Sequence, residues 1–519
     1  MSENRRIAKA TGLMGAATGT SRIAGLVRDM VVANLFGAGF ATDAFFMAFT
    51  IPNLLRRFFG EGSLTAAFVP TFSGIYHKQG EGEAKRVASI CFTLLFIVMA
   101  AVTLAGVLAS PAVVRLIGFG FDDVPGKLAL TDHLNRLMFP YIFFVSLLAL
   151  VTGVLNVRGY YFLPSFSPVL LNLSMIGSAL FLTPFFATPI TALAVGVVLG
   201  GALQLFLQFP LLARIGYLPK PSFAFRHPAV TQISRLMLPG IAGVAIYQIN
   251  VIVTRLLASF LPEGAVSYLY YGQRLFEFPQ GIVIASLAQA VLPAMSRQMA
   301  EDDLDGFKKS LDFSFELLFL LILPASIGLM LCAVPIYSVF FMGGEFAWRA
   351  VNQSGIALIA YAPGLLCVGL SRVVVPAFYA MQDTKTPVQV SFWTLLVNAG
   401  LGLILMQFWA HVGLAVALTL ASLFNALVLL WLLQRRIGNL SFRSLARSTV
   451  RIIPAIVIMT VVVLAILGYG EWSNAASRLQ NGGILFAAVL TGGGSYLLAC
   501  RLFGVRLLQE LGNLRRKKG

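Results

Sequence analysis

Long apolar runs recur from one end of this 519-residue sequence to the other, and they restrict its fold more than any other feature. Each run of about 20 residues is long enough to cross a bilayer as a helix. Charged residues make up 11% of the chain, against about 25% in soluble domains. We therefore predict an all-α polytopic membrane protein with about fourteen transmembrane helices. The predicted spans lie near residues 10–36, 41–59, 88–117, 134–157, 165–186, 190–214, 230–260, 264–296, 311–342, 350–380, 386–409, 411–434, 449–470 and 481–504.

The basic residues that give the chain its net charge of +17 are placed as this topology predicts. With fourteen spans, the large basic groups, from residues 5–9 to residues 515–518, all fall on the side of both termini. The positive-inside rule then predicts that both termini are cytoplasmic. The charge is thus explained by topology and a weak attraction to membrane lipids, with no nucleic-acid partner. The first run lacks a small-residue cleavage site, so we expect a retained span rather than a cleaved signal peptide.

The chain also repeats itself at an offset of about 220 residues. Residues 192–216 resemble 413–438, and residues 68–73 resemble 291–296. Each repeat would hold six spans, so both halves enter the membrane in the same direction, as in transporters built from parallel repeats. The predicted divisions are an N-terminal lobe (1–216), a cytoplasmic linker (217–229), a C-terminal lobe (230–438), and two additional helices with a basic tail (439–519).

Charged side chains interrupt the first apolar run, where Arg22, Arg28 and Asp29 lie in an otherwise small and apolar stretch. A guanidinium in hydrocarbon is costly, so intramembrane arginines nearly always face a bundle interior or a watery cavity. Arg56 and Arg274 add cations to later runs. Arginine binds phosphate oxygens in pairs and stays charged at any working pH. The pattern predicts a cavity for a large anion, and a pyrophosphate would match it.

These residues also have structural interpretations. Arg22 or Arg28 could pair with Asp29 as a tie, although one carboxylate cannot neutralise two guanidiniums in hydrocarbon. Arg274 could likewise pair with Glu277, about one helical turn away. Five further residues support this set. Their acids would balance the positive charge of the cavity, and Arg57, at the end of the second span, could equally extend its charge to the membrane interface. The supporting candidates are Asp43, Arg57, Glu61, Glu277 and Arg372.

Catalytic patterns are missing from the sequence. The four histidines lie in loops or at span ends, and the chain has no phosphate-binding loop, metalloprotease motif or nucleophile elbow. The four cysteines are scattered singly in apolar runs, which predicts buried packing roles. We predict that the protein is not an enzyme, has no cofactor and is not driven by ATP.

Several motifs carry a resemblance to a known family. They are SRIAGLVRD at 21–29, FGAG at 36–39, TDAF at 42–45, PNLLRR at 52–57, EG at 61–62, YYGQRLFEFP at 270–279 and FYAMQDTKTP at 378–387. With these motifs the whole chain resembles the MurJ (MviN) family of lipid II flippases. That family belongs to the multidrug/oligosaccharidyl-lipid/polysaccharide exporter superfamily.

The resemblance implies a V-shaped pair of lobes in the bacterial cytoplasmic (inner) membrane. It implies transport of lipid II, the undecaprenyl-pyrophosphate-linked disaccharide-pentapeptide of peptidoglycan biosynthesis, from the inner to the outer leaflet by alternating access. The helices at 449–470 and 481–504 would form a groove for the prenyl tail. Proteins of cell-wall synthesis or division are further expected partners. The residues implied to engage the pyrophosphate are Arg22, Arg28, Asp29, Arg56 and Arg274, with Asp43 and Glu61 in support.

The energy source is where the sequence departs from the family pattern. Some relatives bind sodium through an aspartate in the seventh span, where this chain has Thr254. An acidic ligand in the eleventh span is also replaced, with Gly402 one turn after Asn398. Asn250, Thr254, Asn398 and Thr419 could form a weak sodium site of neutral oxygens. The membrane potential is an equally suitable energy source.

Other functions stay open at the level of sequence. A flippase for another polyprenyl-pyrophosphate-linked oligosaccharide, of the O-antigen type, would need a similar cavity. A drug exporter should have an acidic cavity, and a membrane enzyme acting on polyprenyl phosphates would need clustered catalytic carboxylates or histidines. A scaffold without transport activity would tolerate the loss of every cavity arginine.

Overall fold

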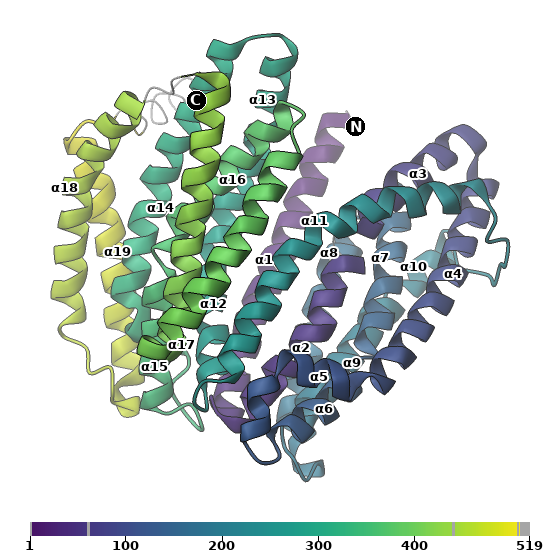
Figure 1. Ribbon diagram of the computed structural model, residues 1–519, viewed down its shortest axis with the longest axis horizontal. Helices are drawn as coiled ribbons and strands as arrows, with labels where there is room; N and C mark the ends of the chain where they lie inside the picture. Colours follow the sequence, from purple (N-terminus) through teal and green to yellow (C-terminus); the bar gives the residue numbers. More distant parts are fainter. Residues whose placement is uncertain (1–2, 60–62, 439–441, 506–507, 509–519) are drawn as a thin grey trace. The chain divides into compact units, whose positions relative to one another are not determined.

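The computed structural model describes residues 3–59, 63–438, 442–505 and 508, whose regular secondary structure is helical apart from one isolated β-bridge (Figure 1). They divide into two compact units, Met1–Gly264 and Ala265–Gly519. The first unit contains α1 (Glu3–Phe36), α2 (Phe40–Phe59), α3 (Ser63–Gln79), α4 (Glu81–Leu108), α5 (Ser110–Ile117), η1 (Phe119–Asp123), α6 (Lys127–Met138), α7 (Tyr141–Val157), α8 (Phe162–Phe181), η2 (Thr183–Phe185), α9 (Thr191–Phe206), α10 (Phe209–Arg214) and α11 (Pro228–Ser259). The second contains α12 (Ala265–Pro279), η3 (Gln280–Ile284), α13 (Ala285–Ala300), α14 (Leu304–Phe340), α15 (Trp348–Tyr361), α16 (Gly364–Ala380), α17 (Lys385–Ile437), α18 (Phe442–Leu467), η4 (Ala475–Ser477) and α19 (Arg478–Leu502).

The predicted all-α class is confirmed. Helices satisfy their backbone hydrogen bonds within one segment, which a chain must do in hydrocarbon. Within the described residues, nine helices are long and apolar enough to cross a membrane, or ten when the bent pair α15–α16 counts as one span. Dividing α17 at its kink, and adding α1, α2 and α11, is consistent with the fourteen predicted spans.

The kink in α17 makes this helix a hairpin rather than one rod. Its 53 residues would measure about 80 Å as a straight helix, far more than a bilayer. Ala410 has φ 47° and ψ −127°, which breaks the helix there. The backbone of Leu405 returns so close to Gly413 that a Cβ on this glycine would lie 2.2 Å from the Leu405 carbonyl oxygen. Glycine is therefore required at the tip.

The internal repeat is visible in the turns that end corresponding helices. Three pairs of residues with positive φ recur 222 or 223 positions apart, namely Gly80 and Asp302, Gly159 and Gln382, and Gly216 and Gly438. One pair also shares its hydrogen bond to the carbonyl five residues earlier, from Tyr160 N to Leu155 O and from Asp383 N to Phe378 O. The two halves therefore repeat the same turn geometry, although most of their side chains differ.

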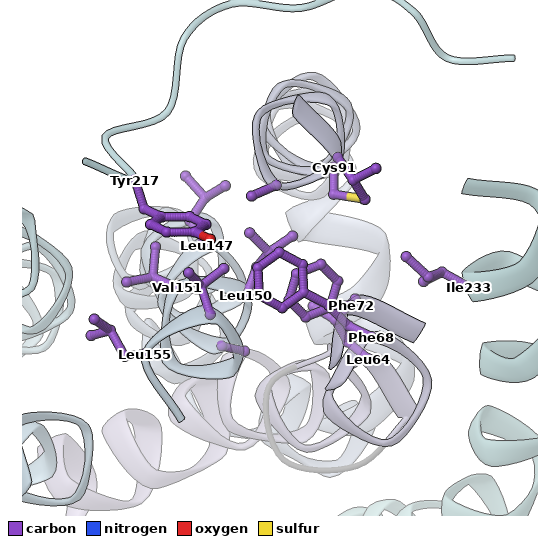
Figure 2. Close-up of a cluster of buried hydrophobic side chains, with 14 of the residues drawn as sticks. Leu64, Phe68, Phe72, Cys91, Leu147, Leu150, Val151, Leu155, Tyr217 and Ile233 are labelled. Carbon is purple, nitrogen blue, oxygen red and sulfur yellow. The ribbon is translucent and has the colours of Figure 1, made fainter. Parts of the chain in front are cut away.

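The core of the first unit lies where α3, α4 and α7 meet (Figure 2). The rings of Phe68 and Phe72 stack with centroids 5.1 Å apart. Tyr217, which follows α10, closes the cluster and contacts the Phe72 ring edge-on at 6.2 Å. Fully burying one such side chain contributes roughly 1.5–3 kcal/mol. This cluster thus fixes the start of the segment after α10 against the helix bundle.

Two added helices, α18 and α19, run side by side and pack against α14 (Figure 1). The Tyr496 hydroxyl donates to Leu320 O at 2.7 Å. At the other end, Arg478 donates to the last α14 carbonyls, Val339 O at 2.6 Å and Phe340 O at 3.0 Å. A cation suits this position because a helix C-terminus carries partial negative charge.

The predicted lobe boundaries, at 216/217, 229/230 and 438/439, stay predictions. By its packing, α11 belongs to the first unit, where it contacts α3, α2 and η1. The four cysteines are free and buried, as their apolar surroundings predicted.

Candidate functional site

Arg28 and Asp29 form a buried pair on the face of α1 that packs against α8. Arg28 Nη2 lies 2.6 Å from Asp29 Oδ1, and Arg28 Nε donates to the same oxygen at 3.0 Å. The exposed fractions are 6% for Arg28 and 2% for Asp29. The structural tie considered above is therefore formed, and it uses Arg28. A buried pair of this kind is costly to break because either partner alone would be an uncompensated charge.

Asn172 of α8 extends this pair and was missed by the sequence interpretation. Its Oδ1 accepts from Arg28 Nη1 at 3.1 Å. Its amide nitrogen donates to Ser21 O of α1 and Pro168 O of α8, each at 3.2 Å. One amide thus fixes the guanidinium and joins the two helices. Because 144 residues separate Arg28 from Asn172, no local pattern could have indicated the contact.

Arg22 and Arg56 complete the predicted basic set of the first unit. Arg22 is partly buried and lies two helical turns before Asp29 on the same helix face. Arg56 donates from Nε and Nη2 to Asn53 Oδ1, one turn earlier, at 3.2 and 3.1 Å. Arg57 beside it is also partly buried. Glu61, a supporting candidate, lies outside the described residues.

Asp43, another supporting candidate, lies in a buried ion pair. Asp43 Oδ2 is 2.9 Å from Lys127 Nζ and accepts from Gly264 N at 2.8 Å. The ammonium group also lies 4.3 Å from the centroid of the Phe121 ring, a favourable cation–π distance. The side chains are 1% and 2% exposed. Sequence reasoning did not identify Lys127 as the partner of Asp43.

Further bonds in the same region join three connections of the first unit. Phe40 N, at the start of α2, donates to Glu263 Oε1 at 2.7 Å. Gly120 N in η1 donates to Ser259 Oγ, at the end of α11, at 3.0 Å. A Cβ on Gly120 would meet the backbone of Ser259 and Phe260 at 2.6 Å. The turn before α2, the η1 segment and the loop after α11 are thus held together.

Arg274 of α12 is the predicted cation of the second unit. Its Nη1 lies 3.8 Å from Glu277 Oε2, and the two side chains are 36% and 35% exposed. Gln273 Nε2 also donates to Glu277 Oε1, at 3.3 Å. Glu277 is thus shared between a cation and an amide, so this pair is looser and more accessible than that of Arg28.

The remaining candidates lie on three helices. Arg372 is exposed in the middle of α16. Asn250 and Thr254 lie on α11 in the first unit, where the threonine hydroxyl donates to Asn250 O at 3.0 Å. Asn398 and Thr419 lie on α17 in the second unit, where the Thr419 hydroxyl donates to Ala360 O at 2.8 Å. The described residues contain no group of three or more His, Cys, Asp or Glu side chains able to hold a metal ion.

The fold and these charges define a class of protein: a polytopic, all-helical membrane protein built from two repeats, with a buried arginine–aspartate pair in its first helix. Solved structures with this fold include "Lipid II flippase MurJ, inward closed conformation", with a TM-score of 0.79, 24% identity, and 96% of this chain and 99% of that chain covered. An inward-facing multidrug resistance MATE family transporter of the MOP superfamily has a TM-score of 0.68 at 14% identity, with 80% and 94% covered.

Sequence comparisons specify the family. The family model described as lipid II flippase MurJ matches residues 32–477. A probable lipid II flippase MurJ from Vibrio cholerae is 38% identical over 520 aligned residues, with 97% of each chain covered. A lipid II flippase MurJ from Burkholderia cenocepacia is 35% identical over 420 residues, covering 80% of this chain and 81% of that one. The chain therefore belongs to the lipid II flippase MurJ family, and the predicted membership is confirmed.

Proposed function

We propose that this protein moves lipid II from the inner to the outer leaflet of the bacterial inner membrane, with both termini in the cytoplasm. Membership of a flippase family, over nearly the whole chain, is the observation that carries the proposal. A flippase moves its substrate without altering a covalent bond, so this family is one of transporters and not of enzymes. The diphosphate of the substrate is the group that arginine forks match best.

Two arginines in the structure have carboxylate partners that a diphosphate could replace. Arg28 is held by Asp29, and Arg274 lies near Glu277. A diphosphate offers anionic oxygens that can accept two parallel hydrogen bonds from a guanidinium, as a carboxylate does. In the proposed mechanism the arginines exchange carboxylate for diphosphate when the substrate enters, and regain the carboxylate when it leaves. The guanidinium charges would thus be compensated in both states.

The energy for resetting the transporter is part of the same proposal. A charge that crosses the membrane gains about 2.3 kcal/mol per 100 mV. A diphosphate moved with an incomplete balance of cations would therefore couple transport to the membrane potential. Sodium bound by Asn250, Thr254, Asn398 and Thr419 is the other candidate source. Contacts with proteins of cell-wall synthesis or division belong to the proposal as well.

Depletion of the protein in cells tests the assignment. Lipid II should accumulate where only cytoplasmic enzymes reach it, and re-expression should return it to the outer leaflet. Complementation by Arg28→Ala and Arg274→Ala should fail although both variants reach the membrane. Arg297→Ala is the matched control because Arg297 is an exposed arginine in the last turn of α13 and belongs to neither pair. An unchanged leaflet distribution after depletion would refute the proposed function.

A further inference from the structure

The segment that follows α10 is hydrogen-bonded to α4. We call residues 217–227 the strap. Lys220 N donates to Ser89 Oγ at 3.3 Å, and Ser222 N donates to Thr93 Oγ1 at 3.0 Å. The strap turns back on itself, since Phe225 N donates to Phe223 O at 2.8 Å. Its backbone therefore follows the first turns of α4 in a defined conformation.

Both ends of the strap are fixed in the first unit. Tyr217 is buried, and the Arg158 guanidinium lies 5.3 Å from the centroid of its ring. Burial raises the pKa of Tyr217 to about 12, so the hydroxyl is neutral at any working pH. At the other end, His227 Nε2 lies 2.9 Å from Glu83 Oε1, while its Nδ1 accepts from Ala229 N at 3.2 Å. The strap is thus built into the protein.

The attachment points place the strap at a membrane boundary. Arg86 is the last charged residue of α4, and the helix is apolar beyond it. Ser89 and Thr93 follow Arg86 by about 4.5 and 10.5 Å along the helix axis. The headgroup region of a leaflet is about 5–8 Å thick, so these contacts lie where headgroups meet hydrocarbon. Phe96, one turn further, is 47% exposed, which fits a face toward acyl chains.

The exposed side chains of the strap combine apolar and basic character. Phe223 is 70% exposed and Leu218 is 49% exposed. Lys220, Arg226 and the adjacent Arg214 are exposed, and the sequence has no acidic residue between positions 133 and 262. In the described part of the chain, none of these three cations has a carboxylate within 4 Å.

The acids in the first turn of α4 do not offset this charge, because each already contacts two basic side chains. Glu81 lies 3.1 Å from Lys85 and 3.8 Å from Arg158. Glu83 lies 2.9 Å from His227 and 3.8 Å from Arg86. The positive charge of the strap is therefore left for a ligand.

We propose that the strap is a binding site for anionic phospholipid of the leaflet it faces. Lys220 and Arg226 bind headgroup phosphates, while Phe223 and Leu218 enter the upper acyl region. Aromatic and basic side chains are the residues that favour the membrane interface, and basic clusters there attract anionic lipid. None of the strap residues belongs to the arginine pairs of α1 and α12, so the proposal does not depend on the cargo of the transporter.

The first test measures lipid selectivity. The full protein is placed in nanodiscs of phosphatidylcholine with or without phosphatidylglycerol, and its preference for spin-labelled phosphatidylglycerol over phosphatidylcholine is determined. The Lys220→Gln/Arg226→Gln variant should lower this preference by about fivefold per cation, and added salt should do the same to the wild type. The matched control is Arg297→Gln/Lys309→Gln, which removes two exposed cations from a connection that also carries Glu301 and Asp305. Equal effects of the two double variants, or no effect of either, would overturn the proposal.

The second test measures how deeply the strap inserts into the membrane, and it remains informative if the lipid preference is small. Phe223→Cys is labelled with a nitroxide, and the native cysteines interfere little because all four are buried. The label should be more accessible to oxygen than to a water-soluble nickel complex. A label at Gln79→Cys, at the exposed C-terminal end of α3, should show the opposite order. A water-exposed label at 223 would exclude lipid insertion, and a label shielded from both reagents would indicate a protein partner instead.

Discussion

Replacing Lys127 by methionine should destabilise the protein far more than its place near a loop suggests. The substitution keeps the length of the side chain but removes the ammonium group 2.9 Å from Asp43 Oδ2. Asp43 is 1% exposed, so its carboxylate would stay buried without its cation. Breaking a buried ion pair by removing one partner costs about 3–5 kcal/mol. We expect a loss of this size in the free energy of unfolding.

A double-mutant cycle separates the pair from simple packing. Adding Asp43→Asn removes the uncompensated charge and keeps an oxygen for Gly264 N, so most of the stability should return. The assay is unfolding in mixed micelles for the wild type, both single variants and the double variant. Lys85→Met is the control, since its pair with Glu81 is 41% and 45% exposed and should contribute at most about 1 kcal/mol. A loss below about 1 kcal/mol for Lys127→Met, or a double variant no more stable than this single one, would refute the reasoning.

Three other predictions concern separate parts of the molecule. Burial raises the pKa of Asp383, but hydrogen bonds from Thr386 and Lys385 and the charge of Arg436 outweigh it and hold this pKa below its ordinary 3.8. The stabilising effect of the ionised carboxylate should therefore be complete at neutral pH, decline as pH falls through 3.8 and vanish below the lowered pKa. The melting-temperature difference between the wild type and Asp383→Asn should narrow in acid, and a difference that widens there would contradict the lowered pKa. Gly120→Ala should lower the free energy of unfolding by about 1–3 kcal/mol, because the added Cβ would meet the backbone of Ser259 and Phe260. Gly177→Ala is the control, since a Cβ there meets nothing within 4 Å, and equal melting temperatures for the two variants would argue against this packing. Arg274→Gln should abolish complementation with little loss of thermal stability, because its contact is partly exposed, and a large loss of stability would instead indicate a structural role.

The class of fold and the repeat could be predicted from the sequence because both depend on periodic apolar patterns. Runs of about 20 residues specify helices in a bilayer whatever their order. The repeat was indicated by matched segments, and the structure shows its turns, for example at Gly159 and Gln382. Asp302 and Gln382 hold positive φ without being glycine, so a search for glycines alone would have missed two of the shared turns.

The partners of the charged residues could be predicted only where they lie close in sequence. The pairs of Arg28 with Asp29 and Arg274 with Glu277 were considered because adjacent or one-turn spacing brings them together. The pairing of Lys127 with Asp43 could not be predicted because 84 residues separate the two. Such long-range contacts depend on helix packing, which no local pattern encodes.

In the proposed function, intramembrane arginines carry a diphosphate-linked lipid across the bilayer. The most direct measurement is transfer of fluorescent lipid II between leaflets in vesicles containing only the purified protein, followed with a reagent that modifies the outer leaflet. The wild type should transfer lipid II, and Arg28→Ala and Arg274→Ala should each slow transfer by about tenfold or more, the effect of losing one charge-assisted bond. Transfer by both variants at the wild-type rate would contradict the account.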